Sequence, residues 1–198
     1  MRRDTTTNGQ GRMELSEIKL DKDTWTAKEV YRRRLPAPGD DSSYCEKNWM
    51  PILDLAFMLV KWTSPTELVD VRLDVASSGP LEGKAAPTDL RGGSQVMPYG
   101  NCYIAIVHEV DLYKDYMGRK DGVYRHRLVV WDKDFKLIGI SPTPFSFLGA
   151  KIEFCAGMAQ LNDKVLITFG YQDNAAYVLS VPNKVIDDMI IEALTYDK

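Results

Sequence analysis

Two short segments of the sequence carry polar side chains that could hold an anion or a hydroxyl-rich ligand. Residues 46–49 include Lys47 and Asn48, which can donate several hydrogen bonds, and Trp49, which can offer an apolar ring surface. The second segment begins at Arg91, whose guanidinium precedes two glycines that allow close backbone approach to a ligand. Neither segment has the spacing of a nucleotide phosphate loop. Structural alternatives are a salt-bridged strand start at residues 46–49 and a tight turn or bulge at Arg91.

Four further polar side chains lie in or next to apolar runs. His108 ends one run and is either a ligand contact or a hydrogen-bonded structural residue, whereas we expect His126 to be structural. Glu153 lies inside another run, so its carboxylate must be paired, or its pKa rises as a general acid requires. Asp173 follows a third run and is either a turn former or an acceptor for a sugar hydroxyl. Because paired carboxylates perform glycoside chemistry, Glu153 is the catalytic candidate.

The composition limits the class of protein and its partners. The chain has 198 residues, and its hydrophobic content of 44% is typical of a globular domain. Its formal charge of −3 offers no basic surface for a nucleic acid, so we expect no nucleic-acid partner. Its longest apolar run, residues 53–60, is too short to cross a membrane. The three cysteines, Cys45, Cys102 and Cys155, are widely spaced and form no metal motif. We expect reduced cysteines, no metal or other cofactor, no membrane partner and a cytoplasmic location.

The apolar runs predict an all-β fold with a short C-terminal helix. They are short, rich in β-branched and aromatic residues, and separated by turn residues. The predicted strands span residues 54–62, 68–75, 102–110, 127–131, 136–140, 164–171 and 176–181. Residues 183–194 alone have apolar positions at helical spacing.

The order of these strands indicates repeated blades. A short polar or small-residue segment precedes an apolar strand three times, and the strand ends recur at intervals of roughly 45 to 60 residues, as in β-propellers. Residues 14–20 and 24–30 are predicted to be the outer strands of an earlier blade. The organisation predicted is a flexible N-terminus over residues 1–13, blades over 14–182 and a helix with a tail over 183–198. About three and a half blades are fewer than a closed ring needs, which suggests the later part of a longer propeller or a degenerate one.

The order of several motifs resembles a known family. The motifs are Glu46-Lys47-Asn48-Trp49-Met50-Pro51, Arg91-Gly92-Gly93-Ser94, Val107-His108-Glu109-Val110, Tyr124-Arg125-His126-Arg127, Ser141-Pro142-Thr143-Pro144-Phe145-Ser146-Phe147, Ile152-Glu153-Phe154-Cys155-Ala156-Gly157 and Phe169-Gly170-Tyr171-Gln172-Asp173. In this order they resemble the five-bladed β-propellers related to inverting mannoside phosphorylases and glycosidases, closest to the branch associated with bacterial glycosyltransferases. The resemblance covers residues 45–182 and implies a partial or degenerate five-bladed propeller.

The resemblance also implies roles for individual residues. Lys47 and Asn48 match an Arg-Asn pair that helps to hold phosphate in the phosphorylases, and His108 matches a strand-ending histidine of the same phosphate site. Glu153 and Asp173 match acids that line the sugar site. A general-acid aspartate upstream of the Lys-Asn position and a second phosphate-site cation have no counterpart in this sequence.

We therefore predict a carbohydrate-active propeller domain that binds a glycan or a sugar phosphate within a glycan-processing system. The expected ligand is an oligosaccharide or a sugar phosphate, and the expected protein partner is a glycosyltransferase domain. Two alternatives stay open. One is a mannoside phosphorylase or glycosidase that uses Glu153 as proton donor, and the other is a non-catalytic protein-interaction scaffold.

Overall fold

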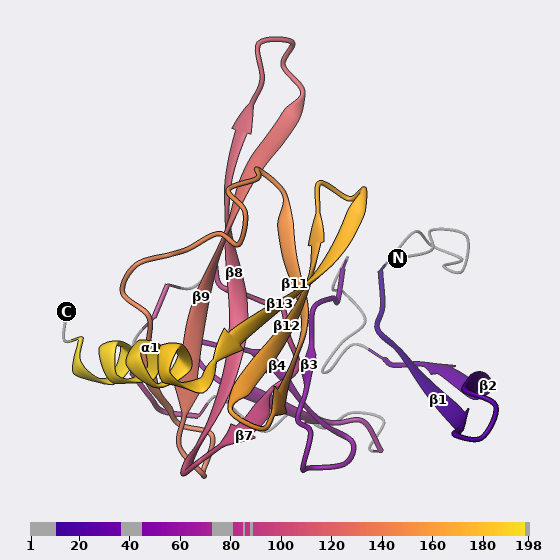
Figure 1. Cartoon of the computed structure of the whole chain (residues 1–198). Coiled ribbons are helices and arrows are strands. Elements are labelled where there is room, and N and C mark those ends of the chain that lie inside the picture. Colours follow the sequence, from indigo (N-terminus) through magenta and orange to yellow (C-terminus); the bar gives the residue numbers. More distant parts are fainter. Residues whose placement is uncertain (1–10, 37–44, 73–80, 85, 88, 197–198) are drawn as a thin grey trace.

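The computed structural model describes residues 11–36, 45–72, 81–84, 86–87 and 89–196, and in these residues it is built almost entirely from antiparallel sheets (Figure 1). The single helix of the described chain, α1 (Asn183–Thr195), lies at the C-terminal end. The predicted all-β class with a C-terminal helix is confirmed. Most of the predicted flexible N-terminus, residues 1–10, lies outside the described residues, and the rest of the predicted domain division stays a prediction.

Three of the sheets repeat the design that the sequence predicts. In two of them a two-residue strand precedes longer strands, and in the third three long strands follow one another, which gives a partial, propeller-like set of blades. The first sheet contains β3 (Met50–Pro51), β4 (Met58–Trp62) and β5 (Glu67–Asp70). The second contains β6 (Arg91–Gly92), β7 (Met97–Tyr99), β8 (Cys102–Lys114), β9 (Lys120–Trp131) and β10 (Leu137–Ile140). The third contains β11 (Glu153–Leu161), β12 (Lys164–Tyr171) and β13 (Ala175–Pro182).

The remaining sheet is the hairpin of β1 (Glu14–Asp21) and β2 (Thr26–Arg34), close to the two strands predicted for an earlier blade. Most of its side chains are exposed. Its base is fixed where Met13 and Leu15 pack against a cluster that includes buried Leu35 and Trp49. The hairpin therefore stands apart from the other blades except at its base (Figure 1).

The β8–β9 pair lies at the centre of the core because both of its faces are covered. Successive side chains of a strand point to opposite faces. One face, which includes Val107 and Trp131, packs against the first blade at Met50. The other face, which includes Ile106, packs against the third blade and α1 through a set that includes Cys155, Met158, Ile167, Ile186 and Ala193.

Beyond the core, β8 and β9 continue as a long hairpin. The sequence predicts strands that end at residue 110 and begin again at residue 127, but backbone pairing runs on to Lys114 and Lys120. The hairpin rises clear of the other sheets (Figure 1), and we call its outer part, residues 111–123, the arm. Ladder hydrogen bonds do not require apolar side chains, so apolar patterning underestimates this pair.

The close packing of β6 leads to a prediction about Gly92. A Cβ atom at this position would collide with the backbone carbonyl of Asn48, whereas a Cβ at Gly170 would meet nothing within 4 Å. We therefore expect Gly92→Ala to lower the thermal unfolding midpoint by several degrees, and Gly170→Ala, the matched control, to change it little. Thermal unfolding followed by circular dichroism checks this, and equal midpoints for the two variants would contradict the packing described.

Candidate functional site

A cleft of about 360 Å³ opens beside the outer half of the β8–β9 pair. Its lining brings together three residues predicted from the sequence, Lys47, Arg91 and His108. The other lining residues are Asp89, Val110, Leu112 and Tyr124. The candidate site is therefore built from three separate parts of the chain.

Strand pairing and one backbone turn bring these parts together. Arg91 on β6 lies directly opposite His108 on β8, so the two side chains share one face of the sheet. Asn48 has a φ of 62°, in the left-handed region that asparagine tolerates better than most residues. Its backbone passes against Gly92, where only a residue without a side chain fits. Lys47 is thereby held next to the β6 strand that carries Arg91.

His108 forms the buried end of the cleft. It is 2% exposed and contacts the ring of Tyr124, with ring centroids 5.5 Å apart, and the ring of Phe154 at 5.2 Å. Its Nδ1 atom has no hydrogen-bond partner among the described residues. The pKa of His108 is lowered to about 4, mainly by burial and also by His126 and the nearby charges of Arg91 and Lys47, while a hydrogen bond to the Gly92 backbone opposes them. His108 is therefore neutral at pH 7 and has a free ring nitrogen.

The charges around His108 favour an anionic ligand. Lys47 and Arg91 are both exposed, and neither forms an ion pair with any residue that the structure describes. Asp89 is the one carboxylate in the described lining of the cleft. Two unpaired cations beside a neutral imidazole can bind a phosphate, a sulfate or a carboxylate through charge-assisted hydrogen bonds.

The part of the cleft that lies farther out along β8 and β9 is apolar. Val110 on β8 pairs with Tyr124 on β9, and Leu112 continues the same face outward. Sequence reasoning assigned no role to these residues or to Asp89. The register of the β8–β9 hairpin places Tyr124 and Leu112 on the same face as His108. The sequence did not predict this register, because the predicted strands were too short.

Four predicted site residues, Asn48, Trp49, Glu153 and Asp173, do not line the cleft. Glu153 is fully buried, and its carboxylate accepts hydrogen bonds from the backbone N–H groups of Phe147, Leu148 and Ala150 at 2.6, 2.9 and 2.9 Å. Both of its oxygens therefore hold the loop before β11, which is a structural role.

The other three residues also lie elsewhere. Trp49 is 5% exposed within the hydrophobic core, and its indole N–H donates to Glu46 at 3.1 Å. Asp173 lies in the exposed turn between β12 and β13 with a φ of 53°. Asn48 does not line the cleft, although its turn positions Lys47.

In the part of the chain that the structure describes, no group of three or more His, Cys, Asp and Glu side chains could hold a metal ion. Cys45, Cys102 and Cys155 are free thiols. No helix in the same ranges is long and apolar enough to cross a membrane.

Comparison with known proteins gives little further information. No family model and no curated protein matches the sequence. A solved structure with a similar chain is that of MPT-4, a mannose phosphorylase from Leishmania mexicana, in complex with phosphate ion. The two have a TM-score of 0.49 and 10% sequence identity over 86% of this chain, which spans 64% of the length of that protein.

Two buried histidines predict how stability depends on pH. His126, directly opposite His108, is also fully buried, and burial lowers its pKa to about 4 against the opposing effect of Glu153. The unfolded chain therefore binds more protons than the folded chain below pH 6.5, so stability is complete above that pH and falls as the pH drops toward 4.

We expect the unfolding midpoint to fall between about pH 6.5 and 5, where few carboxylates titrate. Replacing one titrating group, as in His126→Phe, should make this decline shallower. Thermal unfolding at several pH values checks both statements. The same slope in the variant and the parent chain would show that burial does not perturb His126.

Proposed function

We propose that the cleft binds a sugar phosphate or another sugar bearing an anionic group. The observation that carries the proposal is the convergence of Lys47 and Arg91 on buried His108, with no ion pair at either cation and no partner at His108 Nδ1 among the residues that the structure describes. An interaction scaffold without ligand chemistry would have these polar groups paired with one another. Their unpaired state instead supports a ligand site.

Each side chain has a distinct role in this proposal. Arg91 binds two oxygens of the anion through its planar guanidinium, and Lys47 adds a second positive charge. His108 lies at the buried end of the cleft next to the anion, and the bound negative charge raises its pKa from about 4. The ring of Tyr124 and the side chain of Leu112 pack against the apolar face of the sugar, and Asp89 accepts a hydrogen bond from a hydroxyl. Association with a glycosyltransferase and a cytoplasmic location stay predictions from the sequence.

A substitution at Arg91 tests the site directly. Arg91→Gln should weaken binding of mannose 1-phosphate about 10- to 100-fold, because it removes charge-assisted hydrogen bonds. Arg125→Gln is a matched control, since Arg125 lies on the opposite face of β9 and contacts Asp111 at 3.7 Å. Isothermal titration calorimetry measures both. Absence of binding by the parent chain, or equal loss in the two variants, would overturn the proposal.

A glycoside phosphorylase is the second candidate, because Asp89 lies in the same cleft as the cations. In such a reaction a phosphate oxygen attacks the anomeric carbon, the bond to the leaving sugar breaks, and an acid donates a proton to the leaving oxygen. Asp89 would be that acid, and Lys47 and Arg91 would hold the phosphate.

For this candidate, mannobiose and inorganic phosphate should yield mannose 1-phosphate and mannose, measured by chromatography. Asp89→Asn should abolish the product, while Asp111→Asn, on the opposite face of the hairpin, should not. A lack of phosphate-dependent product would exclude phosphorolysis of this substrate and leave the binding function intact.

A further inference from the structure

The two faces of the β8–β9 hairpin differ in charge where it leaves the core. The face turned away from the cleft carries Glu109, Asp111 and Asp121. Each of these carboxylates forms an ion pair, with Arg127 at 2.9 Å, Arg125 at 3.7 Å and Lys151 at 3.0 Å. This face is therefore electrostatically balanced.

The cleft face has the opposite character. On β8 it presents His108, Val110, Leu112 and Lys114 at alternate positions, and no strand residue on this face of β8 or β9 between positions 108 and 126 is acidic. Lys114 is exposed and forms no ion pair with any described residue. Positive charge therefore occurs at both ends of this face, with an apolar stretch between them.

The spacing of these groups exceeds the size of one sugar phosphate. Six residues separate His108 from Lys114, which corresponds to about 20 Å along an extended strand. Between them, Gly122 lies opposite Leu112, and a Cβ atom there would meet Leu112 Cδ2 and Val110 Cγ1 at 3.1 Å each. Glycine therefore leaves the apolar stretch uncrowded and open to a ligand.

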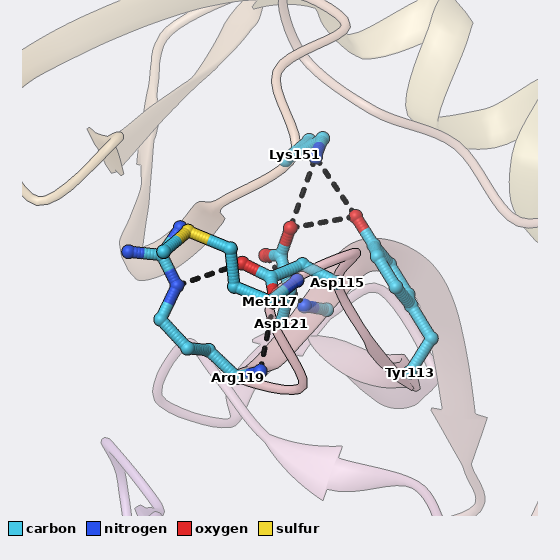
Figure 2. A network of polar contacts seen from close by, with 7 residues as sticks. Tyr113, Asp115, Met117, Arg119, Asp121 and Lys151 are labelled. Carbon is cyan, nitrogen blue, oxygen red and sulfur yellow. Dashed lines mark hydrogen bonds and ion pairs between the residues drawn. The ribbon is translucent and has the colours of Figure 1, made fainter.

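Contacts with Lys151 hold the arm in place, in addition to the pairing between its own two strands. Figure 2 shows Lys151 donating to the hydroxyl of Tyr113 at 2.8 Å and to the carboxylate of Asp121 at 3.0 Å. The backbone N–H of Tyr124 donates to the carbonyl of Lys151 at 2.7 Å. At the tip, Asp115 pairs with Arg119 at 2.8 Å. A surface held by such contacts loses little conformational entropy when it binds a ligand.

We propose that the arm extends the cleft into a binding surface for an oligosaccharide that carries several anionic groups, such as phosphates or sulfates. The inference rests on the proposed function and names the substrate class of the same site. One anionic group binds at Arg91, Lys47 and His108. The following sugar rings lie on Val110, Leu112 and Tyr124, and a later anionic group reaches Lys114.

Ligand length is the variable that tests this inference. Calorimetry compares mannose 1-phosphate, a heparin-derived disaccharide and a heparin-derived hexasaccharide. We expect the hexasaccharide to bind about tenfold or more tightly than the disaccharide, because it reaches both charged ends. Lys114→Gln should weaken hexasaccharide binding about threefold and leave mannose 1-phosphate unaffected. Lys136→Gln, an exposed lysine preceding β10, is the matched control.

The outcomes separate this inference from the proposed function. Equal affinity for the two sulfated glycans, or no effect of Lys114→Gln on the hexasaccharide, overturns the extended surface while mannose 1-phosphate binding still supports the cleft. Loss of all binding, including that of mannose 1-phosphate, overturns the proposed function itself. Inorganic polyphosphate distinguishes a glycan from a bare polyanion. Leu112→Ser should weaken hexasaccharide binding but not polyphosphate binding, and an equal effect on both would exclude the glycan.

Discussion

The pairing of β8 with β9 is the interaction on which the rest of the structure depends. Twelve residue pairs run from Tyr103 opposite Trp131 to Lys114 opposite Lys120 without a shift in register. Because side chains alternate between the faces, a slip of β8 by one residue would move its apolar side chains to the wrong core and His108 away from Arg91. One register therefore fixes two cores, the cleft and the arm.

The repeated blades could be predicted because their burial follows sequence patterns closely. The strand Lys164–Tyr171 and the helix Asn183–Thr195 nearly coincide with the predicted segments, since both bury apolar residues at regular spacing. Apolar patterning missed the arm, where charged residues such as Asp111 alternate with others on a solvated hairpin. It also missed most of β11, because Glu153 lies buried at the start of this strand and accepts backbone hydrogen bonds that no local pattern reveals.

The candidate site was partly predictable for a related reason. Lys47 and Arg91 lie in the short segments that precede apolar strands, His108 lies on such a strand, and all three line the cleft. Trp49, Glu153 and Asp173 also have side chains that could contact a ligand, but Trp49 packs in a core, Glu153 holds a loop and Asp173 lies in a turn. Residue type and spacing alone do not show which polar group is left without a partner. Tyr124 and Asp89 join the cleft through tertiary contacts that the sequence does not encode locally.

The central claim is that an anion binds beside His108. The chain contains two histidines, so nuclear magnetic resonance of the imidazole groups gives two assignable sets of signals, which His126→Phe distinguishes. Titration with mannose 1-phosphate should shift the His108 signals and raise the pKa of His108 above its value of about 4, while the His126 signals change little. Unchanged His108 signals at saturating ligand, or equal shifts of both histidines, would contradict the account.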